Sequence, residues 1–349
     1  MAKMTNDDFF AAKAAEAKAK LAEWAAVFEN HLARDGRNAL VDGCVYAVGS
    51  AGRGELGNSS DLDVFVVTND KPSRLDEMLV QAALIRTMRQ FGLPDPSNEA
   101  SFLRLHGAEE LEQRLGAVED DSSQNTFTAR MLLLLESQPF YGTEGYRRLL
   151  DRVVKAYWRN HERHRDDYLP MLLVNDIVRY WRVVLLNYEA KFARKEREAK
   201  IAEGDIHKHA KEKRLASYKL RFARCMTCYS MIVALLWESR FSTAGNPHVS
   251  PETMLALVDL SPIQRMQRVL AGANAENAHK CATLIAELLE LYLEYLRSRS
   301  MPDGELKPLL DVAAPGGSLF SKADDFGARM SALVQELGQN SPLIRYVVV

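Results

Sequence analysis

The chain has 349 residues, of which 47% are hydrophobic and 26% are charged, so it is long enough for two folded domains with buried cores. This composition excludes disordered and collagen-like proteins. The formal net charge of -2 excludes a uniformly basic nucleic-acid-binding protein, so any basic surface must be local.

The N-terminal residues, the apolar runs and the cysteine content indicate in which cellular compartment the protein is found. The N-terminal residues 1–8 are polar and lack the apolar core of a signal peptide. The most apolar runs, residues 131–135 and 231–236, are far shorter than the roughly 20 residues that cross a bilayer, which predicts no membrane partner. Four cysteines are too few for a disulfide framework and predict a reducing, cytoplasmic setting: Cys44, Cys225, Cys228 and Cys281.

The first third of the chain mixes helix and strand signals. Apolar residues at three- and four-residue spacings predict helices over residues 7–34 and 74–91. Two β-branched and aromatic runs, residues 44–48 and 64–67, predict strands on either side of a glycine-rich stretch. A short strand is predicted over residues 100–105, after the helix-breaking Pro94-Asp95-Pro96.

From residue 126 onwards helical periodicity dominates. The spacing predicts helices over residues 129–137, 146–161, 170–191, 211–240, 251–271, 277–297 and 324–337. The final residues 344–349 are rich in valine and predict a strand that joins a sheet edge or a partner.

These elements predict an α+β fold in two parts. Residues 1–122 would form a domain with a small mixed β-sheet and flanking helices, and residues 123–349 an all-helical domain that forms the other wall of a cleft. The helix over residues 129–137 could pack on either side of that boundary.

A glycine-rich turn follows the first predicted strand. The strand delivers Gly49 and Ser50 to a turn in which a missing Cβ lets backbone N–H groups approach a phosphate, while the serine can donate its hydroxyl. This pattern predicts an anion cradle at Gly49 and Ser50.

Two aspartates enter the second predicted strand. Because Asp61 and Asp63 are two residues apart, their carboxylates should share one face of the strand, while Leu62 and Val64 point to the core. Two neighbouring carboxylates repel each other unless a cation lies between them. Mg²⁺ is the expected ion, because proteins hold it with one or two carboxylates plus substrate phosphates.

This arrangement of strand, Gly-Ser turn, Gly52-Arg53-Gly54-Glu55 and Ser60-Asp61-Leu62-Asp63 resembles the DNA polymerase β-like nucleotidyltransferases. The motif is most similar to the uridylyltransferase domains that modify nitrogen-regulatory proteins and to small related bacterial nucleotidyltransferases. The resemblance implies that Gly49 and Ser50 hold a triphosphate and that Asp61 and Asp63 bind two Mg²⁺ or Mn²⁺ ions. It covers about the first third of the chain.

Three further residues of the motif have open roles. Arg53 could contact a phosphate, or it could pair with Glu55 and only shape the loop. Ser60 could orient the aspartates or cap the turn.

The family also uses a third carboxylate, as a metal ligand and general base, from a later strand. In this chain the candidates are Asp95, in Pro94-Asp95-Pro96, and Glu99, just before the predicted strand at residue 100. A turn residue is the alternative for each. Without such a group the protein would bind nucleotide without turning it over.

Two features of the helical part have a functional and a structural interpretation. Asp176, Arg179 and Tyr180 share a helix face and could touch a nucleotide, or they could form an internal ion pair or a surface row. Residues 191–224 carry 12 Lys or Arg against 5 Asp or Glu. This segment, including Lys219, could contact a triphosphate or RNA, or form a solvated helical surface.

The sequence therefore predicts a metal-dependent transfer of a nucleoside monophosphate from ATP or another NTP to an acceptor hydroxyl, with release of pyrophosphate. The acceptor could be a protein, an RNA or a small molecule. The alternative is a catalytically degenerate domain that senses a nucleotide while the helical part docks a protein or RNA.

Overall fold

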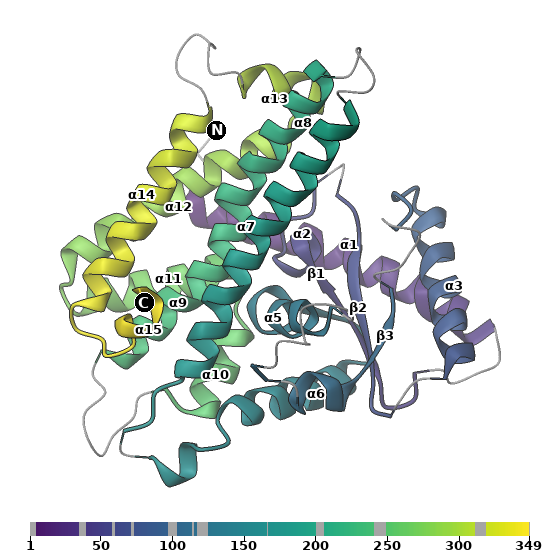
Figure 1. Cartoon of the computed structure of the whole chain (residues 1–349), viewed down its shortest axis with the longest axis horizontal. Helices are drawn as coiled ribbons and strands as arrows, with labels where there is room; N and C mark the ends of the chain where they lie inside the picture. Colours follow the sequence, from purple (N-terminus) through teal and green to yellow (C-terminus); the bar gives the residue numbers. More distant parts are fainter. Residues whose placement is uncertain are drawn as a thin grey trace. The chain divides into compact units, whose positions relative to one another are not determined.

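The computed structural model describes residues 5–34, 40–57, 60–70, 73–96, 103–113, 115–116, 125–165, 167–199, 206–240, 249–310 and 319–348 (Figure 1). They form two compact units. The first unit comprises Met1–His164 and Ser250–Ser261, and the second comprises Arg165–Val249 and Pro262–Val349. The first unit continues past residue 122, where the sequence placed a boundary, because the next helix and strand pack on its sheet.

The first unit is built around a mixed sheet of four strands among the described residues. The strands are β1 (Cys44–Val48), β2 (Asp63–Thr68), β3 (Leu105–Gly107) and β4 (Gln138–Tyr141), in the spatial order β3-β2-β1-β4. Strand β1 runs antiparallel to β2 and β4, and β2 runs parallel to β3. The predicted small mixed sheet is confirmed.

Two strands differ from the prediction. The described strand β3 starts at Leu105, at the last residue of the segment predicted as strand, and residues 100–102 lie outside the described part of the chain. Strand β4 was not predicted, because it is short and contains Pro139. Proline removes a ladder donor and is tolerated at a sheet edge, which is where β4 lies.

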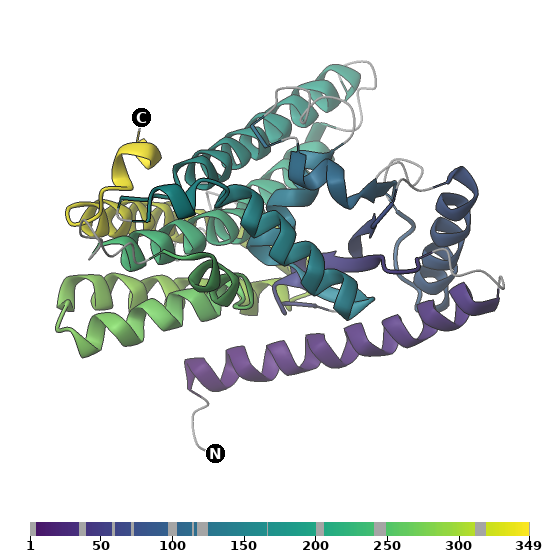
Figure 2. The same cartoon turned by 90° about the horizontal axis from the view of Figure 1, so that it is seen from below.

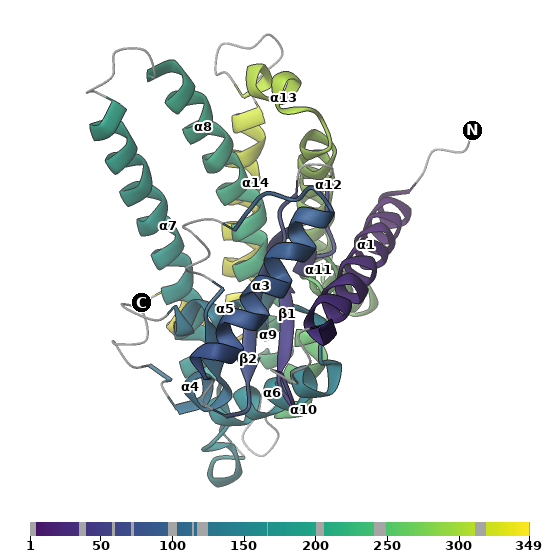
Figure 3. The ribbon, with the colours of Figure 1, turned by 90° about the vertical axis from the view of Figure 1, so that its right-hand side faces the viewer.

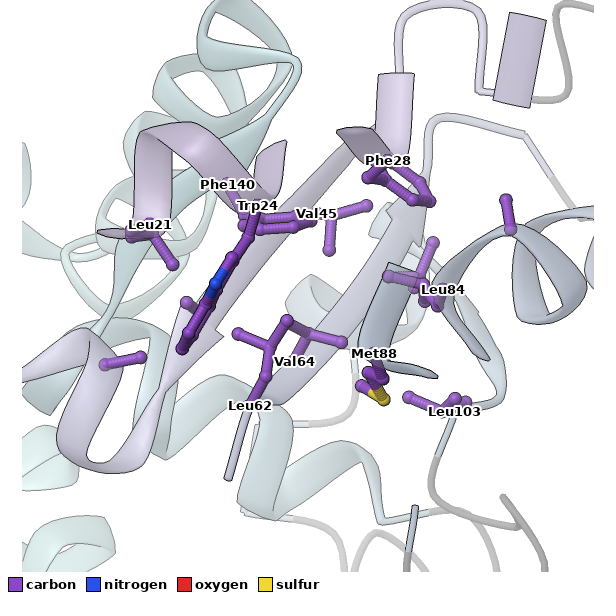
Figure 4. Close-up of a cluster of buried hydrophobic side chains, with 14 of the residues drawn as sticks. Leu21, Trp24, Phe28, Val45, Leu62, Val64, Leu84, Met88, Leu103 and Phe140 are labelled. Atoms are coloured by element: carbon purple, nitrogen blue, oxygen red, sulfur yellow. The ribbon is translucent and has the colours of Figure 1, made fainter. Parts of the chain in front are cut away.

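Helices α1 (Asn6–Arg34) and α3 (Arg74–Gln90) cover one face of this sheet (Figures 2 and 3). Alternate strand residues such as Val45 and Val64 point to that face because side chains alternate along a strand. They pack against Trp24, Phe28 and Leu84 of the helices (Figure 4). Burial of this apolar cluster holds the two helices on the sheet.

The opposite face is covered by α5 (Thr126–Glu136) and α6 (Thr143–Tyr157). Tyr46 of β1 donates a hydrogen bond from its hydroxyl to the carbonyl oxygen of Ala129 over 2.9 Å, and its ring lies 6.3 Å from that of Tyr146. The fully buried Arg130 donates to the Tyr157 hydroxyl over 3.1 Å. The described part of the unit also has three shorter α-helices and one 3-10 helix: α2 (Gly49–Gly52), α4 (Ala108–Gln113), α10 (Pro251–Val258) and His161–Arg163.

The described residues of the second unit are helical apart from their connections. The helices are α7 (Met171–Ala199), α8 (Ile206–Lys219), a π-helical turn (Leu220–Arg224), α9 (Cys225–Ser239), α11 (Pro262–Ala275), α12 (His279–Arg299), α13 (Asp303–Leu309), α14 (Leu319–Gly338) and α15 (Ile344–Val348). The predicted helical C-terminal part is therefore confirmed, and the whole chain is α+β.

Two predictions for the chain after residue 126 were wrong. Residues 251–271 form two helices rather than one, because Pro262 begins a new helix where its missing N–H is tolerated. The C-terminal segment is the helix α15 rather than a strand. It packs on α7 and α14, so tertiary contacts override the strand preference of its valines.

Helix α9 lies in the core of the second unit. The stretch Ala210–Ser239 is long and apolar enough to cross a membrane by composition, but 83% of its most apolar window is buried inside the protein. A buried core helix meets the same criterion of length and composition. An aromatic cluster on one side of this core includes Phe222, whose ring is stacked on that of Tyr295 at 4.9 Å.

Candidate functional site

The glycine turn follows β1 directly and forms the four-residue helix α2. Gly49 has φ +66°, a left-handed conformation that favours glycine. A Cβ at this position would lie 3.0 Å from Oδ2 of Asp63. Glycine is therefore favoured here by the backbone, and the Asp63 carboxylate lies close beside it.

The two aspartates lie where β2 begins. Asp63 is the first residue of β2 and pairs with Val48, the last residue of β1. Burial alternates through this segment: Asp61 and Asp63 are exposed, whereas Leu62 and Val64 are each 5% exposed. The predicted alternation is confirmed, both residues are exposed, and Asp63 lies beside the glycine turn.

A buried ion-pair network lies behind the turn. Arg53 donates from Nε to Glu55 and from Nη1 to Glu136, each over 2.7 Å. All three residues are buried, with Glu136 2% exposed. The pairing of Arg53 with Glu55, one of the two alternatives from the sequence, is confirmed; contact of Arg53 with a phosphate stays a prediction.

Glu136 also determines how Gly49 is held. The backbone N–H of Gly49 donates to Oε1 of Glu136 over 3.0 Å. A Cβ on Gly52 would overlap the carbonyl oxygen of Glu136, so the end of α5 and the turn are in direct backbone contact. In this conformation the N–H of Gly49 serves the protein itself, and phosphate contact by Gly49 stays a prediction.

Sequence reasoning missed Glu136. It is 87 residues from Gly49 along the chain, and nothing in its spacing connects the two. The available signal was a single acidic residue at the end of an apolar helical run, Met131 to Leu135. A buried charge needs a partner, so such a residue points to a buried cation elsewhere in the chain.

The two serines have different surroundings. Ser60 accepts a hydrogen bond at Oγ from the N–H of Gly57 over 2.9 Å, which is the turn-capping role predicted as one alternative. Ser50 is half-buried, and its carbonyl oxygen accepts the N–H of Glu55 over 2.7 Å. Contact of Ser50 with a phosphate stays a prediction.

The candidates for the third carboxylate lie apart from this site or outside the description. Asp95 is exposed and receives two hydrogen bonds from Arg89, of 3.0 and 3.2 Å, which hold the pKa of that carboxyl below its usual range. Glu99 lies outside the described residues. Within the described ranges, no three His, Cys, Asp or Glu residues are grouped as a metal site.

The donor set at Asp61 and Asp63 nevertheless fits a hard divalent cation. Both residues are exposed, on either side of the buried Leu62. Mg²⁺ is bound in proteins by one or two carboxylates plus substrate phosphates, so two carboxylates beside a turn suffice as the protein's share.

The polar residues of the second unit that were predicted to touch a nucleotide lie in different surroundings. Asp176 is 2% exposed and pairs with Arg179, whose Nη1 lies 3.3 Å away, and Tyr180 is also buried. The predicted internal ion pair is confirmed. Lys219 is exposed at the end of α8, and its contact with a nucleotide stays a prediction.

Part of the basic segment is paired between α7 and α8. Lys195 contacts Glu212 at 3.0 Å, and Lys213 contacts Glu196 at 2.8 Å. These exposed or half-buried pairs contribute little free energy individually. They show that some of the local positive charge is neutralised within the helical pair.

Comparison with known families recognises the part of the chain that carries this site. Residues 33–136 match the family model of the nucleotidyltransferase domain, a match that begins before Gly49 and ends at Glu136. Neither the curated proteins nor the solved structures contain a match to the chain. The closer likeness to uridylyltransferase domains stays a prediction.

Proposed function

We propose that the protein transfers a nucleoside monophosphate from an NTP to an acceptor hydroxyl, on the premise that residues 33–136, which match the family model of the nucleotidyltransferase domain, fold and act as such a domain. The acceptor oxygen attacks the α-phosphorus, and the bond from that phosphorus to the bridging oxygen breaks. Pyrophosphate leaves, and the acceptor's proton passes to a base.

The observation that carries the proposal is the exposed Asp63 beside the turn at Gly49, with the exposed Asp61 two residues before it in the chain. Bound Mg²⁺ or Mn²⁺ would stabilise charge on the attacking and leaving oxygens, as in other phosphoryl transfers. The two carboxylates would bind the metal ions and so keep their positive charge beside the triphosphate. The task of Ser50 is to donate its hydroxyl to a phosphate oxygen, and the turn orients the triphosphate.

The proposal requires a proton acceptor for the attacking hydroxyl. Asp95 and Glu99 are the two carboxylates offered by the sequence. Because Asp95 is held by Arg89 on the surface, we expect Asp95→Asn to leave transfer within about twofold of wild type. We expect Glu99→Gln to lower it at least about 100-fold, in the range reported for loss of a general base. Transfer at the wild-type rate in both variants would exclude both residues as the general base.

Label transfer tests the reaction itself. The purified protein is incubated with each α-³²P-labelled NTP, with Mg²⁺ or Mn²⁺, and with a lysate separated into protein, RNA and small-molecule fractions. Label in one fraction identifies the acceptor class. The double variant Asp61→Asn/Asp63→Asn should give no label above background.

Asp70→Asn is the matched control for that experiment. Asp70 is an exposed carboxylate just beyond the other end of β2, so its replacement removes one negative charge, as each of the two substitutions does, but away from the turn. Loss of transfer in this control as well would show that overall charge, rather than the Asp61 and Asp63 site, governs the reaction.

A nucleotide sensor is the second candidate function. It is favoured by one observation: among the described residues, no third His, Cys, Asp or Glu is grouped with Asp61 and Asp63 as a metal site. The sensor would bind an NTP with Mg²⁺ and leave its phosphates intact. Measurable NTP binding by calorimetry, with no transfer to any fraction, would support the sensor and contradict the transferase.

A further inference from the structure

Glu136 connects the end of α5 to the glycine turn at both of its side-chain oxygens. Oε1 accepts the N–H of Gly49 over 3.0 Å, and Oε2 accepts Nη1 of Arg53 over 2.7 Å. Its side chain has no exposed surface. A carboxylate that is both buried and charge-paired holds its partners in one geometry, because any displacement leaves a charge in a medium of low polarity.

The position of Gly49 in turn sets the surroundings of Asp63. The Cα of Gly49 bears its hydrogen toward Oδ2 of Asp63, where a Cβ would be at 3.0 Å. Val48, the preceding residue, pairs with Asp63 across the strands. A shift of the turn therefore moves the wall against which the Asp63 carboxylate rests.

From these contacts we infer that Glu136 is a positioning residue for the nucleotide site, acting on Asp63 through Gly49 and on the turn through Arg53. The inference rests on the proposed function, because it assigns a task within that same site. The Glu136 side chain is buried, and its two oxygens contact Gly49 and Arg53. Its effect is on the orientation of the groups that bind nucleotide and metal.

The alternative is that Glu136 only stabilises the fold. A purely structural residue would lower the free energy of unfolding on replacement and leave the ligand affinity of the folded molecules unchanged. A positioning residue also changes that affinity, because the groups of a binding site must be held within about 0.5 Å of their binding geometry. The two roles are separated by measuring affinity and stability on the same variants.

Three variants test the inference. Glu136→Leu removes both contacts, with Gly49 and with Arg53. Glu136→Gln keeps the volume and an oxygen that can accept the N–H of Gly49, but it loses the charge opposite Arg53. Ser137→Ala is the matched control: Ser137 follows directly in the chain, and its hydroxyl bonds instead to Leu133 and Tyr146.

The probes are the four α,β-methylene nucleoside triphosphates with Mn²⁺, since the bridging carbon prevents transfer. Affinity is measured by calorimetry and by electron paramagnetic resonance of free Mn²⁺, and the midpoint of thermal unfolding is measured in parallel. We expect affinity to fall about 100-fold in Glu136→Leu and about tenfold in Glu136→Gln, with Ser137→Ala within about twofold of wild type.

Unchanged affinity in a folded Glu136→Leu would overturn the inference, whatever its unfolding midpoint. If that variant does not fold, Glu136→Gln decides, and an affinity within about twofold of wild type would overturn it. Failure of the wild type to bind any of the four probes would also overturn it. Binding that depends on Glu136 without any NMP transfer would instead uphold the inference and contradict the transferase.

Discussion

The two ends of strand β1 are held by different physical means. At its C-terminal end, the turn at Gly49 is fixed by a buried network of charged side chains, Glu136 and Arg53 with Glu55. At its N-terminal end, the backbone of Gly43 is packed directly against Gly142, where a Cβ would overlap the carbonyl oxygen of Gly43. One end is held by side-chain charge and the other by close backbone contact.

This difference separates the residues that serve the site from those that serve the fold. Side-chain charges can be changed one at a time while the backbone path is kept. A backbone contact between glycines admits no side chain at all, so any substitution there acts on the whole unit. The variants below test whether activity and stability divide in this way along β1.

The largest effect is expected at the site end, for Asp63→Asn. We expect transfer to fall at least about 1000-fold, because a neutral amide binds a divalent cation far more weakly than a carboxylate. The free energy of unfolding should change by less than about 0.5 kcal/mol, because Asp63 is exposed. Initial transfer rates and urea unfolding measure the two quantities.

A result opposite to this one would contradict the comparison. If Asp63→Asn unfolded at much lower urea concentrations than wild type, the carboxylate would serve the fold, and the loss of transfer would no longer identify a site. Asp70→Asn supplies the baseline for an exposed carboxylate beyond the other end of the same strand.

Gly142→Ala should have the opposite profile. Gly142 has φ +68°, and the added methyl group would overlap the carbonyl oxygen of Gly43. We expect a loss of about 3 kcal/mol in the free energy of unfolding, from the left-handed conformation and the backbone clash together. Transfer per folded molecule, measured below the unfolding transition, should stay within about twofold of wild type. A tenfold loss of transfer at unchanged stability would show that this end also serves the site.

The parts of the fold that follow from local patterns were predictable. Long apolar periodicity predicted α1 and α3, and β-branched runs predicted β1 and β2. Strand β4 was missed because it has four residues and includes Pro139, which argues against a strand unless an edge position is known. Helix α15 was wrongly predicted as a strand because Ile344 packs on Gly338. Intrinsic strand propensity takes no account of such a tertiary contact.

The same division between local patterns and long-range contacts applies to the site. Asp61 and Asp63 were predicted because the alternation of side chains along a strand is local. The pairing of Arg53 with Glu55 spans two residues and was available as an alternative. Glu136 was not predictable, since it reaches Gly49 only after the chain has formed two further strands and packed α5 on the sheet.

The next effect in size is a loss of folding stability at acid pH, which is caused by His106 in β3. Burial, with the nearby charge of Arg104, lowers the pKa of His106 to about 3 from its usual value near 6.5. The unfolded chain therefore binds a proton below about pH 6.5 that the folded chain does not, so stability falls as the pH falls from about 6.5 toward 3. Since one proton corresponds to about 1.4 kcal/mol per pH unit, the loss between pH 7 and pH 5 is about 2 kcal/mol.

His106→Phe isolates this contribution, because it keeps a ring beside Phe65, whose centroid lies 5.9 Å from that of His106. We expect the unfolding free energy of the variant to fall less than that of wild type between pH 7 and pH 5, by about 2 kcal/mol. Urea unfolding at both pH values measures this difference. Parallel curves for the two proteins would contradict the assignment, and transfer at pH 7.5 should be unaffected in either case.

The smallest effect is expected for Ser60→Ala, within the loop that leads to Asp61. The hydroxyl of Ser60 accepts the N–H of Gly57, so its removal should lower the free energy of unfolding by about 0.5 to 1 kcal/mol, the net contribution of one hydrogen bond. Because that hydroxyl is engaged within the turn, transfer should stay within about threefold of wild type. A much larger loss of transfer at unchanged stability would instead assign Ser60 to the orientation of the aspartates. The residues that serve the site would then include the loop between the C-terminal end of β1 and the start of β2.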